Sequence, residues 1–345
     1  MTVDVMSSAR PEVDAALLLL ARLGLTPDDL MAGAASQAPV PTFAQFVPKV
    51  AAAVTAGTLK AYGSYWNRVV QRWGARRLDE PSPLEIEQLG KQIRAERVQR
   101  RNGRGGSGAE ENFVAAMRCL YRRAVANGLI AEAQNPAARV AKPRRQASLR
   151  QALRDDRLAE INRVAASGGD DPQLDSLILR LHEETACRRG GALGLRPVDL
   201  DREQSLVRLR EKGGTQRWQP VSPTLMAHLA DHSTQRLASQ DVPLLRYRDG
   251  RPITYRRYDG LWVRLGRELP WVAAQGTSTH WIRHTILTWV ERNFGYAVAR
   301  AYAGHNDSSH NAGTTTTYVR ATIHEVAAAL AALTGEPHPL AAVEQ

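Results

Sequence analysis

A histidine, an arginine and a tyrosine late in the chain could act together on a phosphate group. His280 and Arg283 lie three residues apart, and Gly304-His305 and then Tyr318 follow them. A tyrosine hydroxyl has an ordinary pKa of about 10 and is a poor nucleophile at neutral pH. It becomes useful where cationic groups crowd the electrophile and hold the charge that develops. The cluster therefore predicts a negatively charged electrophile, for which phosphate is the obvious candidate.

Two earlier segments supply further cations at turns or at the ends of predicted elements. Arg188 and Arg189 follow Thr185-Ala186-Cys187, where we expect a helix to break at Gly190. Either guanidinium could fork onto two phosphate oxygens, and we favour Arg188 by its register. Lys212 lies at the tip of a predicted hairpin.

The elements that must position these side chains are mainly helices. Apolar residues at helical spacing predict helices over 155–166, 172–186, 224–237, 255–269, 281–293, 297–302 and 323–333. Short alternating segments predict strands at 199–201, 206–209 and 218–221, and residues 211–215 join the last two as a hairpin. This part of the chain is therefore predicted to be mostly α with one small antiparallel sheet.

The preceding segment, residues 42–145, is also helical in pattern. A helix is predicted over 58–73, with an apolar face of Leu59, Tyr62, Trp66, Val69, Val70 and Trp73. A second stripe ends at Asn127-Gly128 and consists of Phe113, Met117, Leu120, Tyr121 and Val125. Aromatic residues at this spacing indicate a core more often than platforms for stacked bases.

This segment is also strongly basic. Nineteen Lys and Arg face eight Asp and Glu between residues 42 and 145, an excess equal to the net charge of +11 of the whole chain. With a pI near 10.1, the charge indicates a polyanionic partner, although a basic surface that only aids solubility is an alternative. The candidate contacts to a phosphate backbone are Lys60, Arg68, Arg72, Arg100, Arg101, Arg104, Lys142, Arg144 and Arg145.

Length and composition set the remaining bounds. The 345 residues fit two domains with short appendages. Cys119 and Cys187 give no disulfide framework and suit a reducing cytosol. The apolar run Leu17–Leu20 is too short to span a bilayer, so we expect a cytoplasmic protein without a membrane segment.

The chain resembles the tyrosine recombinase, or phage integrase, family in five motifs that occur in order: Thr185-Ala186-Cys187-Arg188, Lys212, His280-Trp281-Ile282-Arg283, Ala303-Gly304-His305 and Thr314–Tyr318. Each motif alone is weak, but their order and spacing are specific. The resemblance covers residues of about 42 to 335. It implies an N-terminal helical core-binding (SAM-like) domain and a mainly helical catalytic domain with a small antiparallel β-sheet.

This resemblance implies the following division of the chain: a helical appendage and linker at 1–41, a core DNA-binding domain at 42–140, a basic linker at 141–150, a catalytic domain at 151–335 and a tail at 336–345. It also implies that Ile323, Val326, Leu330 and Leu333 form an apolar stripe that docks into a neighbouring protomer. Packing of this stripe on its own domain is the alternative.

The resemblance assigns a role to each motif residue. Arg188, in a T-G-x-R type turn, and Arg283, in H-x-x-R, match the arginines that hold the scissile phosphate. Lys212 matches the lysine that protonates the departing 5′-oxygen.

The three remaining motif residues are two histidines and the tyrosine. His280 and His305 match positions that contact the phosphate or help to move the tyrosine proton. Tyr318 matches the nucleophile that forms a 3′-phosphotyrosyl bond. Because that bond stores the energy of the broken linkage, the reaction needs no metal, ATP or other cofactor.

The implied activity is site-specific cleavage and rejoining of double-stranded DNA. The enzyme would act as a homotetramer in synapsis, on DNA of the cytoplasm and its nucleoid. A type IB topoisomerase and a non-catalytic DNA-binding regulator on the same fold are the alternatives. Integration, excision, resolution and transposition are all compatible with the motifs.

Two departures from the family pattern stand out. Many relatives carry an acidic residue three positions after the first arginine, where this chain has Gly191. The support for the pocket must therefore come from elsewhere, with Asp199 or Asp201 as candidates. Residues 306–317 are also a few residues longer than in compact members, which predicts a mobile loop that delivers Tyr318 on assembly.

Several other residues compete for roles in the site. Tyr296 and Tyr302 are alternative tyrosines, but they precede Gly304-His305 and we expect both to pack in the core. His280 and His284 have the spacing of a zinc pair. The glutamate of a zincin is absent and Arg283 would repel a cation, so we expect no metal.

Overall fold

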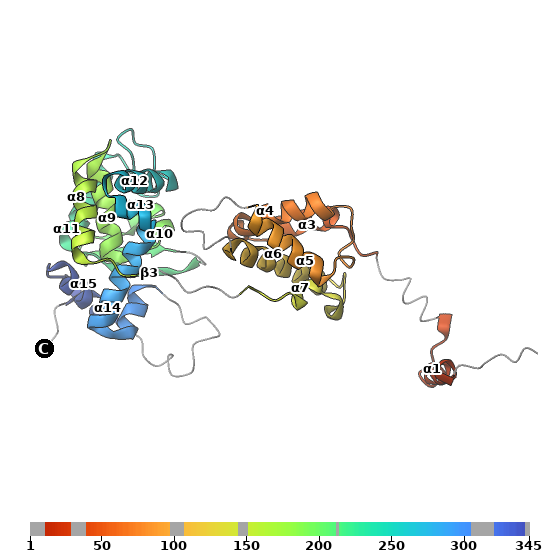
Figure 1. Cartoon of the computed structure of the whole chain (residues 1–345). Coiled ribbons are helices and arrows are strands. Elements are labelled where there is room, and N and C mark those ends of the chain that lie inside the picture. The colour runs from red at the N-terminus through yellow and green to blue at the C-terminus, as the bar shows by residue number, and fades with distance from the viewer. Residues whose placement is uncertain are drawn as a thin grey trace, which may run out of the picture. The chain divides into compact units, whose positions relative to one another are not determined.

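The computed structural model describes residues 11–28, 39–96, 107–143, 151–211, 214–304 and 321–341. Contacts within the chain divide it into two compact units, residues 1–146 and 147–345. Figure 1 shows that both units are helical and that the strands belong to the second unit. Within the described ranges, no helix is both long enough and apolar enough to cross a membrane.

Unit 1 consists of helices. Their bounds are α1 Pro11–Arg22, α3 Phe43–Ala53, α4 Ala56–Trp73, α5 Pro83–Ala95, α6 Ser107–Ala126 and α7 Pro136–Arg139, with a 3₁₀ turn η2 at Glu132–Gln134. Helices α3 and α5 each begin with a capping box, formed by Thr42 with Gln45 and by Ser82 with Glu85. In such a box, side chains satisfy backbone groups that the first helical turn leaves without partners.

Aromatic residues form the core of unit 1, as their spacing predicted. Trp66 and Tyr121 are fully buried. The Trp66 indole donates to the Ala116 carbonyl at 3.0 Å, and the Tyr121 hydroxyl donates to the Leu78 carbonyl at 2.8 Å. Both rings therefore hold helices together and are not available to stack on bases. Leu59, by contrast, lies outside this core with an exposed fraction of 41%.

Unit 2 combines helices with one small sheet. The helices are α8 Asp155–Ser167, α9 Pro172–Thr185, α10 Arg189–Leu193, α11 Pro223–Gln235, α12 Tyr255–Glu268, α13 Pro270–Gln275, α14 Thr279–Tyr302 and α15 Ile323–Thr334, with 3₁₀ turns η3 Pro197–Asp199 and η6 Pro339–Ala341. The predicted break at Gly190 is wrong. Helix α9 ends at Thr185, and Gly190 lies inside the short helix α10.

The sheet is antiparallel, in the order β1-β2-β3. Its strands are β1 Leu200–Asp201, β2 Leu206–Arg210 and β3 Gln216–Pro220. Strands β2 and β3 pair from Leu206 opposite Pro220 to Arg210 opposite Gln216. The backbone N–H of Glu211 then donates to the Thr215 carbonyl at 2.8 Å. The hairpin predicted around residues 211–215 is therefore present.

Helix α14 bends at Gly295, whose φ of 82° and ψ of 170° are not helical. The break agrees with the two separate helices predicted at 281–293 and 297–302. The bend lets α14 carry His280 and Arg283 near its start and deliver Gly304 just beyond its end.

Helix α15 packs on unit 2 itself, against α14, α9 and β3. Val326 and Leu330 are buried in this contact. The alternative, packing of the stripe on its own domain, is therefore what the structure shows for Val326 and Leu330, whereas Ile323 and Leu333 are only half-buried. Burial of leucine in its own domain removes the surface that a partner would need.

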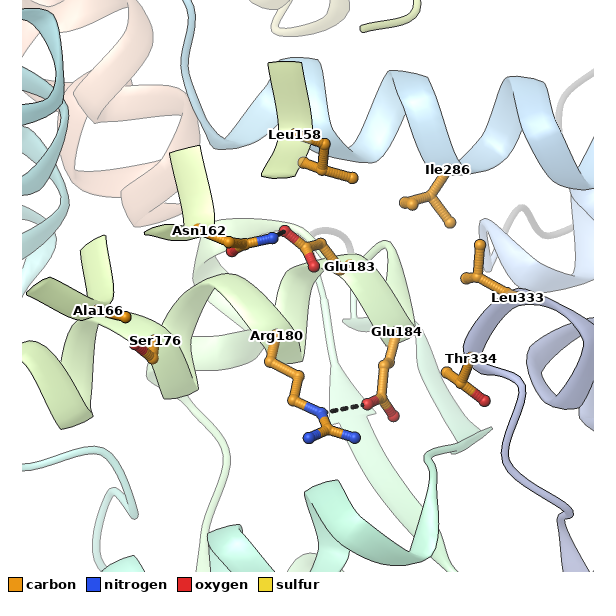
Figure 2. A pocket seen from close by; sticks show the side chains of 10 residues that line it. All are labelled: Leu158, Asn162, Ala166, Ser176, Arg180, Glu183, Glu184, Ile286, Leu333 and Thr334. Atoms are coloured by element: carbon orange, nitrogen blue, oxygen red, sulfur yellow. Dashed lines mark hydrogen bonds and ion pairs between the residues drawn. The ribbon is translucent and has the colours of Figure 1, made fainter. Parts of the chain in front are cut away.

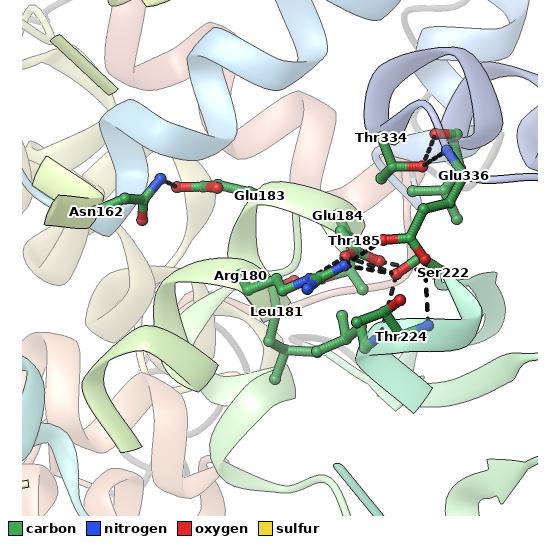
Figure 3. Close-up of polar contacts among 12 residues, drawn as sticks. Asn162, Arg180, Leu181, Glu183, Glu184, Thr185, Ser222, Thr224, Thr334 and Glu336 are labelled. Carbon is green, nitrogen blue, oxygen red and sulfur yellow. Dashed lines mark hydrogen bonds and ion pairs between the residues drawn. The ribbon is translucent and has the colours of Figure 1, made fainter. Parts of the chain in front are cut away.

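A polar network fixes the far end of α15 to α9 and α11 (Figure 3). The Arg180 guanidinium donates to Glu184 at 2.7 Å and to Glu336 at 2.6 Å. Glu184 accepts in turn from the Ser222 backbone N–H at 2.7 Å and from its hydroxyl at 2.9 Å. The residues directly after α15 are thus bound to the body of unit 2.

A pocket of about 460 Å³ lies beside this network (Figure 2). Its lining includes Leu158 on α8, Ile286 on α14 and Leu333 on α15, together with Glu183. Glu183 accepts a hydrogen bond from the Asn162 amide at 2.8 Å. Burial raises the pKa of the Glu183 carboxyl to about 7.

Candidate active site

The turn after α9 aims the first candidate arginine. Ala186 has a left-handed φ of 46°, which ends the helix, and the Cys187 backbone N–H donates to the Thr185 hydroxyl at 3.2 Å. The His182 ring bonds the Cys187 carbonyl through Nδ1 and the Tyr258 hydroxyl through Nε2, each at 3.0 Å. Since a carbonyl only accepts, Nδ1 donates. Burial lowers the pKa of His182 to about 4, so the ring is neutral.

Arg188 follows this turn and is bound twice by one carboxylate. Its backbone N–H donates to Glu211 Oε1 at 2.7 Å, and its guanidinium donates to Glu211 Oε2 at 2.8 Å. The Glu211 side chain is fully buried, whereas 36% of the Arg188 side chain is exposed. Glu211 therefore holds the Arg188 backbone, while part of the guanidinium is still exposed to solvent.

Arg283 is buried and joins two segments that are distant in sequence. Its guanidinium donates to the Ala186 carbonyl and, at 2.8 Å, to the Ala303 carbonyl. Burial, and after it the charge of Arg188, lowers the pKa of Arg283 to about 10, so the side chain is still charged at neutral pH. One arginine thereby connects the turn that carries Arg188 with the residues just before His305.

Arg217 on β3 contacts three segments of the site, at Thr185, Glu211 and Gly304. It is almost fully buried, its guanidinium donates to the Thr185 carbonyl at 3.2 Å, and its Nε lies 3.8 Å from Glu211 Oε2. Gly304, with φ of 63°, packs against it, and a Cβ added there would lie 2.5 Å from Arg217 Cδ. Glycine is therefore required at this step of the chain on both conformational and steric grounds.

The structure brings together some of the predicted residues and does not describe others. Arg188 and Arg283 meet around the turn after α9, and His280 is exposed one turn before Arg283 on α14. Lys212, His305 and Tyr318 lie outside the described residues, as does the loop predicted at 306–317. Their neighbours Glu211 and Gly304, however, are both part of the site.

The competing residues lie elsewhere. Arg189 is exposed and pairs with Asp259 on α12 at 3.3 Å, whereas Arg188 pairs with Glu211. Tyr302 is buried as predicted, its hydroxyl donates to the Glu184 carbonyl, and burial raises its pKa. This environment is unsuited to a nucleophile. Tyr296 is 59% exposed, so the prediction that it packs in the core is wrong.

The two proposed substitutes for the missing acid do not contact Arg188 in the structure. Asp199 is buried and bonds Arg208 at 2.9 Å and Arg210 at 2.6 Å, which ties it to the sheet. Asp201 accepts from the Gln204 backbone N–H at 3.0 Å. Glu211 and Arg217 contact the site instead, and sequence reasoning missed both. The available signal was their position at the two ends of the hairpin that carries Lys212.

The candidate DNA contacts of unit 1 are on its surface where they are described. Lys60, Arg68 and Arg72 are exposed on α4. Arg68 pairs with Glu96 at 3.0 Å, and Lys142 pairs with Glu111 at 3.3 Å. These exposed pairs are weak and can exchange for phosphate. The remaining candidates lie outside the described residues, namely Arg100, Arg101, Arg104, Arg144 and Arg145.

Comparison with known proteins agrees with this geometry. The model of the phage integrase family matches residues 151–324. Tyrosine recombinase XerD of Mycobacterium tuberculosis is 28% identical over 304 residues, covering 79% of this chain and 89% of XerD. Tyrosine recombinase XerC of Mycobacterium bovis is 34% identical over 138 residues, covering 36% of this chain and 46% of XerC.

Two solved structures share the fold. A lambda integrase fragment, solved as a dimer bound to a core site, has a TM-score of 0.59 at 16% identity, over 77% of this chain and 96% of the fragment. The Tn1549 transposon integrase, in complex with transposon right end DNA, has a TM-score of 0.60 at 15% identity, over 85% of this chain and all of that one (100%).

The matched model covers the whole of the described site in unit 2, from Arg188 through Glu211 and Arg217 to Arg283 and Gly304. The chain therefore belongs to the phage integrase family. It is an enzyme of the tyrosine recombinase class, which breaks and rejoins DNA strands. The mostly helical fold with a small antiparallel sheet is confirmed.

Proposed function

We propose that the chain recombines specific sites in double-stranded DNA through a covalent bond to Tyr318. The observation that carries the proposal is the bridge made by Arg283, whose guanidinium bonds both Ala186, next to the Arg188 turn, and Ala303, next to His305. Residues separated by about a hundred positions in the sequence are joined at one point. The bridge brings the two described cations, Arg188 and Arg283, to one place, where we propose that the phosphodiester binds.

In this proposal, Arg188 and Arg283 hold the non-bridging oxygens of the scissile phosphate. The Tyr318 oxygen attacks phosphorus, a tyrosine–phosphate bond forms, and the bond to the 5′-oxygen breaks. Lys212 gives a proton to the departing oxygen, while His280 and His305 contact the phosphate or accept the tyrosine proton. The extra negative charge of the transition state is balanced by the two guanidiniums.

Rejoining is the same reaction in reverse with a second strand. A free 5′-hydroxyl attacks phosphorus and gives its proton to Lys212. The bond from phosphorus to the Tyr318 oxygen breaks, and Tyr318 regains its proton from the histidine that had accepted it. Because one phosphate ester replaces another at each step, the chemistry needs neither ATP nor a metal. The two half reactions on two duplexes would be organised by a homotetramer, acting on DNA in the cytoplasm and its nucleoid.

Support for DNA as the substrate comes from unit 1. Its exposed cations on α4 belong to a segment that carries an excess of basic charge equal to that of the whole chain. The XerD, lambda and Tn1549 proteins are recombinases or integrases, and the last two were solved on DNA. We extend that partner to this chain, with unit 1 as the core DNA-binding domain.

A nicked suicide substrate tests the proposal. When the nick lies close to the cut site, the short released strand diffuses away and the covalent adduct accumulates. We expect the wild-type protein to form an adduct that resists denaturation, and Tyr318→Phe to form none. Tyr296→Phe is the matched control, because Tyr296 is exposed, and it should form adduct at the wild-type rate.

The outcomes separate this proposal from its competitors. Absence of adduct with the wild-type protein on a cognate site would favour a DNA-binding regulator. Relaxation of supercoils by a monomer without any preferred site would favour a type IB topoisomerase. Adduct formation by Tyr318→Phe would show that the nucleophile is another residue.

A further inference from the structure

Glu211, at the end of β2, contacts two arginines of the candidate site, Arg188 and Arg217. Its side chain is fully buried at the end of β2. Its carboxylate accepts from the Arg188 backbone at 2.7 Å and from the Arg188 guanidinium at 2.8 Å, and lies 3.8 Å from Arg217 Nε. Two oxygens of one side chain therefore fix both the backbone and the head group of Arg188.

The space that Glu211 fills lies over Gly191. A Cβ built on Gly191 would lie 3.3 Å from Glu211 Cγ and 3.5 Å from its Oε1. Gly191 is buried in α10, three residues after Arg188. A carboxylate side chain at residue 191 would therefore compete with Glu211 for the same volume, and the glycine leaves that volume to the hairpin.

We infer that Glu211 is the positioning residue for Arg188, and that it supplies from the hairpin the carboxylate that α10 lacks at Gly191. This inference rests on the proposed function. One oxygen binds the Arg188 backbone, and the other turns the guanidinium, which leaves its remaining donors to face the phosphate. Glu211 does not itself touch the reacting atoms.

The location of Glu211 has a second consequence. Glu211 directly precedes Lys212 in the chain. The same two hydrogen bonds that orient Arg188 therefore fix the start of the segment that carries the proposed general acid. The carboxylate that orients Arg188 therefore belongs to the residue directly before Lys212.

The buried charge also requires its partners. A carboxylate removed from water is costly unless it is paired, and here Arg188 and Arg217 neutralise it. Arg217 in turn lies against Gly304, just before His305. The hairpin acid is thus connected on one side to Arg188 and on the other to the segment that leads to His305.

The test compares cleavage rate, DNA affinity and thermal stability in full-length variants on the nicked substrate. Glu211→Gln retains the size of the side chain and removes its charge. We expect single-turnover adduct formation to slow by about 10- to 100-fold, since small errors in orientation are costly. DNA affinity should stay within about twofold. Glu203→Gln, in the exposed β1–β2 turn, is the control and should not change the rate.

Relocation of the acid is the decisive variant. Gly191→Glu and Glu211→Gly are each expected to slow adduct formation, the first by crowding and the second by loss of the carboxylate. The double variant, Gly191→Glu with Glu211→Gly, returns one carboxylate to the same space. We expect it to be at least about tenfold faster than either single variant, a rescue that a merely structural role for Glu211 would not give.

Each result decides the matter. Adduct formation by Glu211→Gln at the wild-type rate, or a double variant no faster than the singles, would overturn the inference. If Glu211→Gln does not fold, Glu211→Asp keeps the charge and shortens its reach. Slow cleavage with unchanged melting of that variant supports positioning, and unchanged cleavage contradicts it. Failure of the wild-type protein to form any adduct would instead refute the proposed function.

Discussion

Arg283 is a positively charged side chain in a buried position, where an unpaired charge would be energetically unfavourable. Burial lowers the pKa of its guanidinium to about 10, so the group stays charged at neutral pH. Two carbonyls accept its hydrogen bonds. An isolated buried charge would be far less favourable. The two hydrogen bonds require an arginine at this position, because a lysine has no planar guanidinium with which to bridge two carbonyls.

The first prediction follows for Arg283→Lys. We expect single-turnover adduct formation on the nicked substrate to fall by about a hundredfold or more, while DNA affinity changes little. Arg189→Lys is the control, because Arg189 is exposed and pairs with Asp259. Equal losses in the two variants would contradict the assignment of the second phosphate-binding arginine to Arg283.

The second prediction concerns Gly304. Gly304→Ala places a methyl group in a left-handed conformation and against the buried Arg217 side chain. We expect it to lower the free energy of unfolding by about 2–4 kcal/mol, the sum of backbone strain and overpacking. Gly335→Ala has the same strain at φ of 70° in open space, and should cost about 1–2 kcal/mol. Urea unfolding of both variants measures the difference, and equal costs would refute the close packing on Arg217.

The third prediction concerns pH and His182. The pKa of His182 is about 4 in the folded protein, below its ordinary value of 6.5. The unfolded chain therefore binds the proton first, and stability falls as pH decreases from about 6.5 toward 4. The full effect is on the order of 3 kcal/mol.

Urea unfolding at several pH values tests this origin of the acid sensitivity. In His182→Gln, the slope of the free energy of unfolding against pH should be smaller across that window, by an amount that corresponds to about one bound proton. The exposed His228→Gln is the control and should keep the wild-type dependence. Equal pH dependence in wild type and His182→Gln would show that His182 is not the group responsible.

At the scale of elements, the position of α15 gives the fourth prediction. Leu330 is fully buried within unit 2, whereas Leu333 borders the pocket between α9, α14 and α15. Leu330→Ala should lower the free energy of unfolding of the monomer by about 2–5 kcal/mol, through lost burial and a new cavity. Leu333→Ala should cost clearly less. If Leu330→Ala left the monomer unchanged and impaired only assembly, α15 would be a docking element after all.

The elements show what the sequence could and could not predict. Helical spacing located α8, α9, α11 and α12 within a few residues, because local apolar periodicity determines them. Helix α13 was not predicted, because Pro270 was interpreted as the end of α12. Proline is also favourable in the first turn of a helix, which is where Pro270 lies.

The site was harder to predict for a related reason. Motif order identified Arg188 and Arg283. The partner of Arg188, however, depends on how the β2–β3 hairpin packs on α10, where Glu211 lies over Gly191. Glu211 lies 23 residues from Arg188 in the chain, and no local pattern links them. Asp199 was a reasonable candidate from sequence, yet Arg208 and Arg210 already occupy its carboxylate.

At the scale of the whole molecule, charge gives the fifth prediction. Each phosphate neutralised on duplex DNA lowers the logarithm of affinity by about 0.9 per logarithmic unit of salt. Replacing Lys60 and Arg72 by alanine should therefore reduce the salt slope by up to about 2. Arg118→Ala is the control, since the part-buried Arg118 guanidinium already donates to the Ala137 carbonyl at 3.3 Å and to the Val140 carbonyl at 2.8 Å. A slope that did not change would contradict the assigned DNA-binding face of α4.

The most direct test of the account locates the covalent bond itself. Tryptic cleavage after Arg300 and Arg320 yields one peptide, residues 301–320, that contains both Tyr302 and Tyr318. The adduct trapped on the nicked substrate is digested with nuclease and trypsin, and the remaining nucleotide is located by fragmentation in the mass spectrometer. We expect the phosphodiester remnant to be attached to Tyr318. Attachment to Tyr302, or to any residue outside this peptide, would contradict it.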